Sequence, residues 1–310
     1  MKRRLVKQGT ATLMISVPSK WCKANNLNKG DEVDVEESEN DLRISTSEIT
    51  KQKKETMISI NEENQKELRN ILTHLYRKGF DKITIENVSI QSMRNIRNIV
   101  EKLLLGFEIT EKNGSQCMIE NISEPSEGKY GAMLNKVFLI MRESFEMLEE
   151  DFETGKLQNL QEMEEIKIQQ DRLILFCRRL LIGSYAGENM ALEWELLTFL
   201  THIQHAVFYL YKFASENRIK PESQMYSLIK SLNEYFRLLY GVYRNKNIRL
   251  IHKINYLKDS YQFGKCIEAI EKGKGKNAVV YSYIRELFRL IQLGTSPLLG
   301  EILEENRSKS

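Results

Sequence analysis

The sequence predicts an α+β protein of several domains, with short strands in the first third of the chain and long helices after it. The chain has 310 residues, of which 41% are hydrophobic, and this is enough for two or three domains with buried cores. Only four prolines occur, and after the first third hydrophobic residues recur with the helical period of 3.6. In the first third, short β-prone runs are separated by glycine and asparagine turn signals.

The first 48 residues are expected to form one domain with the element order ββαββ. Gly9 can adopt a positive φ between two β-prone runs, so we expect these runs to form a hairpin. Pro18 cannot continue a strand ladder but suits the first turn of a helix, and Gly30 marks the turn after that helix. The expected strands and helix cover residues 4–6, 12–17, 19–25, 32–36 and 41–45.

This domain is near the lower limit of size at which a chain can bury its own core. A second copy of the chain would supply the missing core, so the sequence predicts a homodimer. The apolar side chains that two copies would share are Val6, Leu13, Ile15, Val17, Trp21, Leu27, Val33, Val35 and Ile44.

Positive charge is concentrated at the N-terminus. The first 23 residues carry six basic side chains and no acidic one, although the formal net charge of the whole chain is only +3. The six are Lys2, Arg3, Arg4, Lys7, Lys20 and Lys23. Basic side chains without acidic neighbours attract phosphate groups, and a symmetric dimer presents each of them twice. The sequence therefore predicts a surface that binds double-stranded DNA.

The stretch LVKQGTATLMISVPSKWCKANNLNKGDEVDVEE resembles the AbrB/MazE/SpoVT swapped-hairpin family over residues 2–47. The resemblance implies that each chain supplies half of a small β-barrel dimer, which presents basic residues of the first strand, the loop and the short helix to DNA. Carried over to this chain, the DNA-binding residues are Arg3, Arg4, Lys7, Lys20 and Lys23. The alternative is a dimerisation domain whose basic strand pairs with the acidic strand beside it.

A second domain is expected over residues 55–123, with the order βαβαββ. Strands are predicted over 57–60, 82–86, 107–110 and 116–122, and helices over 61–78 and 89–105. Asn113 and Gly114 form a strong turn signal between the last two strands. This small α+β domain contains no glycine-rich phosphate loop and no metal-ligand spacing, so its sequence predicts no function.

Residues 129–306 are expected to form six long helices. Short loops between long amphipathic helices favour antiparallel neighbours, hence two three-helix bundles in tandem. The two bundles cover residues 130–217 and 222–305, and the stretch 199–217 aligns loosely with 288–306.

These tandem bundles behind an AbrB-like domain resemble the PhoU family of phosphate-uptake regulators, including fused archaeal forms. In that family the third helix of each bundle carries two acidic residues at a spacing of four, which bind a metal cluster with acids of the second helix. Here the corresponding pairs are Gln204 with Phe208 and Gln292 with Ser296. Since both pairs lack carboxylates, we predict no metal site.

A residual metal site on the second helix is the alternative that the sequence leaves open. Glu164, Glu165 and Asp171 lie on that helix and are potential metal ligands. His202 and His205 share a helix face, but without a third ligand two such histidines are more often packing residues.

No pattern in the sequence indicates catalysis. The chain lacks a nucleophile-elbow serine, and Gly273-Lys274-Gly275-Lys276 lacks the upstream strand and the Ser or Thr of a phosphate-binding loop. We therefore expect neither an enzyme nor a cofactor. The four cysteines are scattered, and the most apolar segment, LILFCRRLLIG, is interrupted by Arg178 and Arg179. We expect a cytoplasmic protein without membrane insertion.

The sequence thus favours a homodimeric, DNA-binding transcriptional regulator with a PhoU-like helical region that receives a signal. The resemblance implies that this signal is phosphate status. The alternative function is a PhoU-like adaptor that binds a phosphate transporter or sensor protein and uses its N-terminal domain only to dimerise.

Overall fold

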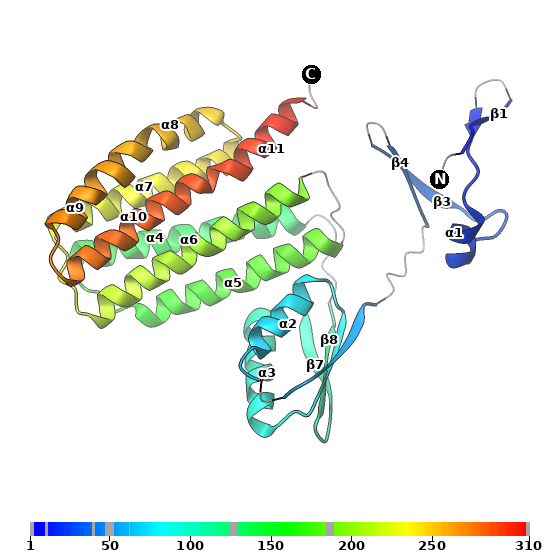
Figure 1. The fold of residues 1–310 in the computed structure, drawn as a ribbon, viewed down its shortest axis with the longest axis horizontal. Coiled ribbons are helices and arrows are strands. Elements are labelled where there is room, and N and C mark those ends of the chain that lie inside the picture. The colour runs from blue at the N-terminus through cyan, green and yellow to red at the C-terminus, as the bar shows by residue number, and fades with distance from the viewer. Residues whose placement is uncertain are drawn as a thin grey trace. The chain divides into compact units, whose positions relative to one another are not determined.

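The structure is a computed structural model that describes residues 3–9, 12–38, 41–46, 53–61, 63–123, 129–183 and 189–307. The chain divides into two compact units (Figure 1). Unit 1 is Met1–Lys53 and unit 2 is Lys54–Ser310.

Unit 1 consists of two antiparallel hairpins with one short helix between them. Its elements are β1 (Val6–Gln8), β2 (Thr12–Met14), α1 (Ser19–Ala24), β3 (Val33–Ser38) and β4 (Asp41–Thr46). Strand β1 pairs with β2 and β3 pairs with β4, so the hairpins form two separate two-stranded sheets. The order is the predicted ββαββ. The first strand, predicted over residues 4–6, instead begins at Val6, where pairing with Met14 starts.

Local sequence explains why α1 is short. The carbonyl of Pro18 accepts hydrogen bonds from the backbone N–H groups of Trp21 and Cys22, which starts the helix. Asn26, with φ of 53°, then takes the left-handed conformation that asparagine tolerates, and the N–H of Leu27 returns to the carbonyl of Cys22. The helix ends after six residues.

Unit 2 begins with a four-stranded sheet that carries two helices on one face (Figure 1). The elements are β5 (Glu55–Ser59), α2 (Leu68–Arg77), β6 (Lys82–Glu86), α3 (Ile90–Leu103), β7 (Phe107–Asn113) and β8 (Gln116–Asn121). The strand order is β5-β6-β8-β7, in which only β5 and β6 are parallel. This is the predicted βαβαββ order, with the last two strands joined at Gly114 by a turn of positive φ.

Helix α2 begins seven residues later than predicted. Asn61 and Asn64 exchange hydrogen bonds between backbone N–H and side-chain oxygen, each 2.8 Å long. The Asn64 side chain also donates to the carbonyl of Ser59. Asparagine side chains that bond to the local backbone compete with helix formation, which accounts for the late start.

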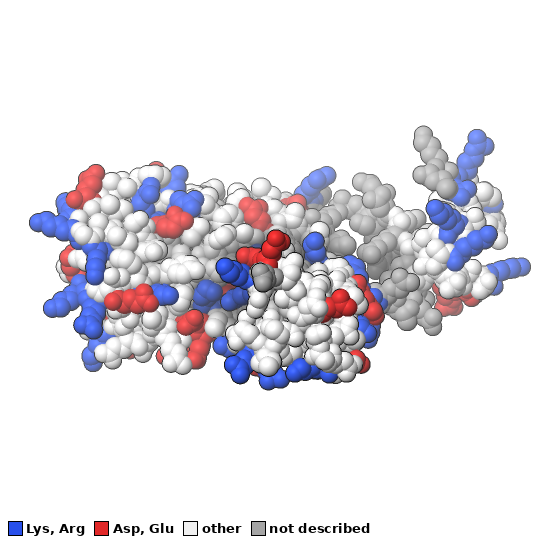
Figure 2. Space-filling view, turned by 60° about the horizontal axis from the view of Figure 1, so that its bottom comes forward, with Lys and Arg blue, Asp and Glu red and all other residues white. Residues whose placement is uncertain are grey.

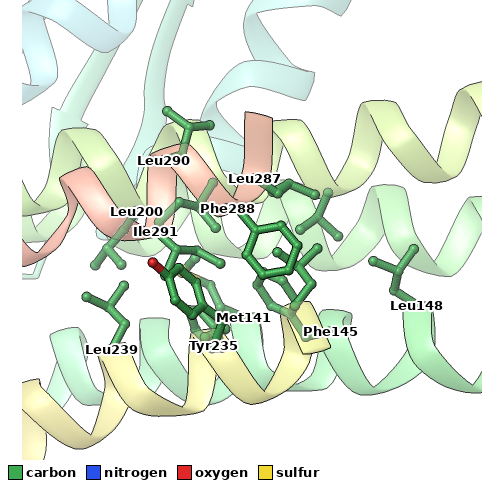
Figure 3. Packing of buried hydrophobic residues seen from close by; sticks show 14 of the residues in the cluster. Met141, Phe145, Leu148, Leu200, Tyr235, Leu239, Leu287, Phe288, Leu290 and Ile291 are labelled. Carbon is green, nitrogen blue, oxygen red and sulfur yellow. The ribbon is translucent and has the colours of Figure 1, made fainter. Parts of the chain in front are cut away.

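The remainder of unit 2 is helical. The helices are α4 (Lys129–Thr154), α5 (Leu160–Gly183), α6 (Met190–Glu216), α7 (Ser223–Asn245), α8 (Ile248–Lys258), the π-helix η1 (Asp259–Lys265), α9 (Cys266–Lys272), α10 (Lys276–Leu293) and α11 (Thr295–Arg307). Helices α4, α5 and α6 pack together, as do α7, α8, α9 and α10. The two groups join through α6 against α10 and α4 against α7. Figure 3 shows Phe145, Tyr235 and Phe288 meeting in the shared core.

Two predicted helices are interrupted. The fifth contains the π-helix, where the backbone carbonyl of the buried Gln262 accepts a hydrogen bond from the side-chain Nε of Arg285. The sixth breaks at Gly294, because Pro297 has no N–H and would collide with the carbonyl of Leu293 in a continuous helix. Gln292 and Ser296 therefore do not lie on one uninterrupted helix, as the predicted alignment requires.

The sheet and the helical region share a hydrophobic core. Phe176 and Leu180 of α5 pack with the fully buried Leu72, Tyr76 and Ile119 of the α+β part. The regions predicted as separate domains, residues 55–123 and 129–306, consequently lie within one compact unit.

Candidate functional site

The predicted DNA-binding residues are all exposed on unit 1. Arg3 and Arg4 precede β1, Lys7 lies within β1 opposite Leu13, and Lys20 and Lys23 lie on α1. Figure 2 shows Lys and Arg side chains gathered on the face of this unit that is turned to the viewer. Because β1 pairs with β2 and not with β3, the basic strand does not pair with the acidic strand within one chain.

Unit 1 also exposes an apolar surface. None of the hydrophobic side chains described in unit 1 is buried. The most exposed are Leu5, Val6, Leu13, Met14, Ile15, Val17, Val35 and Leu42, which we call the apolar surface of unit 1. Leu13 and Leu42 are 60% and 64% exposed. So many exposed apolar side chains on so small a unit indicate that it interacts with a partner.

Comparison with known proteins identifies the class of this N-terminal unit. Residues 6–55 match the family model described as antidote-toxin recognition MazE, bacterial antitoxin. The match confirms that the N-terminal domain is of the MazE/AbrB type. Neither the curated proteins nor the solved structures contain a match to the chain. The helical region fits a helical bundle, and its resemblance to PhoU stays a prediction.

The positions that correspond to metal ligands in the PhoU resemblance have other roles. Gln204 is fully buried and its Oε1 accepts a hydrogen bond from Ser144, whereas Gln292 donates to Asn255. Glu164 and Glu165 are exposed on α5. Within the described ranges, no three His, Cys, Asp or Glu side chains form a group that could hold a metal ion.

Asp171, the third candidate ligand, is surrounded by basic side chains. Its carboxylate lies 2.8 Å from Lys167 Nζ, 2.8 Å from His205 Nε2 and 3.6 Å from a guanidinium nitrogen of Arg69. Burial raises its pKa, but His205 and Lys167 outweigh burial and hold the pKa of Asp171 below its ordinary value. Asp171 is therefore an anionic partner of three basic groups, and it links α2 to α5 and α6.

Arg179 has a structural role that sequence reasoning missed. Its guanidinium donates to the carbonyls of Tyr76 and Phe80 and lies 2.5 Å from Asp81 Oδ1. It also lies over the rings of Tyr76 and Phe107. An arginine pair within an apolar helical segment is the signal that could have indicated this buried contact. Arg179 fastens α5 to the α+β part of unit 2.

Glu193 provides a prediction about pH. Burial, followed by the nearby charge of Glu301, raises the pKa of Glu193 from 4.5 to about 7. The folded protein therefore keeps a proton that the unfolded chain loses between these values. The resulting stabilisation is complete below pH 4.5 and is lost as the pH rises towards 7.

We expect Glu193→Gln to gain stability relative to the wild type as the pH rises from 5 to 8. Urea unfolding of both proteins at these two pH values measures the change. Glu164→Gln, an exposed position on α5, is the matched control and should show no such difference. The same stability difference between Glu193→Gln and wild type at both pH values would contradict the prediction.

No helix in the described part of the chain is both long enough and apolar enough to span a membrane.

Proposed function

We propose that the chain is a homodimeric DNA-binding transcriptional regulator, in which unit 1 both forms the dimer and contacts duplex DNA. The observation that carries this proposal is the joint presence, on one small unit, of an apolar surface and exposed basic side chains. The apolar surface of unit 1 would be buried by a partner, and a second copy of the chain is the partner that requires no other protein. The match to the MazE family model supports it.

The basic side chains supply the DNA contact. Arg3, Arg4, Lys7, Lys20 and Lys23 carry five positive charges per chain, and a twofold axis doubles them. Charged side chains on a strand, its flank and a short helix can contact phosphate groups along one groove of the duplex. We assign no catalytic role to the chain.

The PhoU resemblance extends the proposal to phosphate uptake. On this view the helical part of unit 2 receives the signal, and the protein adjusts transcription for phosphate homeostasis in the cytoplasm. The division of the helical part into α4–α6 and α7–α10, which pack against each other, supports this resemblance. Phosphate as the signal rests on the resemblance alone.

Salt-dependent binding to duplex DNA tests the proposal. Fluorescence anisotropy with the upstream region of the protein's own gene should show binding that weakens steeply with salt. Each of Arg4→Ala and Lys20→Ala should lower the slope of log K against log salt by about two, since one phosphate contact is lost in each chain of the dimer.

Lys274→Ala is the matched control, because Lys274 is an exposed lysine in the loop between α9 and α10. It should bind DNA like the wild type. If Arg4→Ala and Lys20→Ala both bind DNA with the affinity and salt slope of the wild type, the proposal that unit 1 binds DNA is wrong. The adaptor that contacts a phosphate transporter or sensor would then be the better proposal.

A further inference from the structure

A basic cavity lies where α2 meets α5 and α6 in unit 2. Its volume is about 540 Å³, within the range of roughly 300–1,000 Å³ typical of small-molecule sites. Arg77 and Lys78 line it from the end of α2, Arg178 from α5, and Trp194 and Thr198 from α6. None of the described residues that line the cavity is acidic.

Arg178 is the most unusual group in the cavity. The residue is only 8% exposed, and one guanidinium nitrogen donates a 3.0 Å hydrogen bond to Thr198 Oγ1. Its guanidinium carbon lies 5.2 Å from the ring centre of Trp194. The Nε atom is buried and has no hydrogen-bond partner among the described residues.

A buried guanidinium ordinarily has a carboxylate partner, because an uncompensated charge is costly to remove from water. Within the residues that the structure describes, Arg178 forms no ion pair with a carboxylate. Burial, followed by the charge of Arg77, lowers the pKa of Arg178 to about 10, which leaves it charged at neutral pH. The charge of Asp171 acts on Arg178 from a distance, but among the described residues no carboxylate contacts the Arg178 guanidinium directly.

Arg77 and Lys78 add further positive charge to the cavity, and the pKa of the nearby His74 reflects it. Burial, followed by the charges of Arg77, Lys78 and Arg178, lowers the pKa of His74. One guanidinium nitrogen of Arg77 lies 2.7 Å from His74 Nδ1 and 2.6 Å from His74 Nε2, and because arginine can only donate, the ring nitrogen without a proton is the acceptor. Arg77, Lys78 and Arg178 together give the cavity a positive potential that attracts anions.

We propose that this cavity binds a small organic phosphate, a monoester whose phosphate group meets Arg77, Lys78 and Arg178. A phosphate monoester carries about −1.5 to −2 charges at pH 7, which matches this set of cations better than the single charge of a carboxylate. Arginine binds phosphate through parallel hydrogen bonds, and lysine binds it as a point charge. The organic part would lie on the side of Trp194.

The burial of Arg178 favours a small molecule over a nucleic acid. Arg178 is more than nine-tenths buried, so the backbone of a duplex would not reach it. The proposal does not depend on DNA binding by unit 1, and its test does not involve DNA.

Tryptophan fluorescence provides a direct test, because the chain contains only two tryptophans, Trp21 and Trp194. In full-length protein with Trp21→Phe, all tryptophan emission comes from Trp194. Phenyl phosphate should change this emission in a saturable way and bind more tightly than inorganic phosphate, and phenol should cause no saturable change. Isothermal titration calorimetry should give the same order of affinities.

Substitutions then locate the site. Arg178→Gln should weaken phenyl phosphate binding about tenfold or more, as expected for loss of a hydrogen bond to a charged group. The double variant Arg77→Gln with Lys78→Gln should do the same, and it alters the rim of the cavity without touching the buried Arg178. Arg94→Gln removes one exposed positive charge from α3 and should leave affinity unchanged.

Three results would overturn the proposal. The first is the absence of saturable binding of phenyl phosphate, and the second is unchanged affinity in the Arg77→Gln, Lys78→Gln double variant. The third is binding of phenol or inorganic phosphate as tight as that of phenyl phosphate, which would exclude recognition of an organic phosphate. Thermal unfolding of each variant shows whether it retains the fold.

Discussion

Replacing Leu13 with aspartate should convert the full-length protein from a dimer to a monomer. Leu13 lies in β2, is 60% exposed in the single chain and belongs to the apolar surface of unit 1. If a second copy covers this surface, the substitution buries one aspartate from each chain in the dimer core, which is destabilising even though Lys7 lies opposite position 13 in the hairpin. Sedimentation velocity of wild type and Leu13→Asp at the same concentration measures the change.

Ile90→Asp is the control for this experiment. Ile90 is 80% exposed at the start of α3 in unit 2, so the same kind of substitution should leave the dimer intact. Leu42→Asp, on β4, should act like Leu13→Asp and guards against an effect peculiar to one strand. If Leu13→Asp and Leu42→Asp both remain dimers, the protein does not dimerise through unit 1.

The loss of the dimer should also weaken DNA binding. A monomer presents one set of basic side chains, so it loses half of the phosphate contacts expected for the dimer. The slope of log K against log salt should therefore fall by about half in Leu13→Asp, although none of the basic residues has been altered.

Local turn chemistry made most elements predictable from the sequence. Pro18 before α1, Ser89 as the N-cap of α3 and Gly114 between β7 and β8 each mark a boundary with a defined physical cause. Long runs of helical periodicity located α4, α5, α6 and α7, because a stripe of large apolar residues has to be buried.

Two features were not predicted from the sequence: the late start of α2, which depends on competing local hydrogen bonds, and the core shared by α5 and the sheet, which depends on contacts between distant segments. The hydrogen bonds between Asn61 and Asn64 are local, but the helical pattern outweighed them in the prediction. The core that α5 shares with the sheet joins residues about a hundred positions apart, so no local pattern indicates it.

The two candidate sites also differ in how far the sequence predicts them. The basic residues of unit 1 are close together in sequence, so their concentration could be recognised without a structure. The basic cavity combines Arg77 and Lys78 of α2 with Arg178 of α5 and Trp194 of α6. Only the packing of three separate helices brings these side chains together, and the sequence offers no spacing that predicts it.

Arg179→Ala should lower the free energy of unfolding of unit 2 by about 3–5 kcal/mol, the usual effect of breaking a buried ion pair. The side chains of Arg179 and Asp81 are only 11% and 17% exposed. The substitution leaves Asp81 without its guanidinium partner and removes the donor to the carbonyls of Tyr76 and Phe80. Urea unfolding followed by circular dichroism measures the loss.

Two further variants separate the ion pair from a general effect of losing an arginine. Arg289→Ala removes an exposed arginine that pairs with Glu286 on the same helix, so it should cost less than about 1 kcal/mol. The double variant Asp81→Asn with Arg179→Met should lose less stability than Arg179→Ala, because it leaves no unpaired charge in the interface and restores apolar packing against Tyr76 and Phe107. The loss in free energy of unfolding could be as small for Arg179→Ala as for Arg289→Ala. That result would show that the shared core of Phe176 and Leu180, and not Arg179, holds α5 to the α+β part of unit 2.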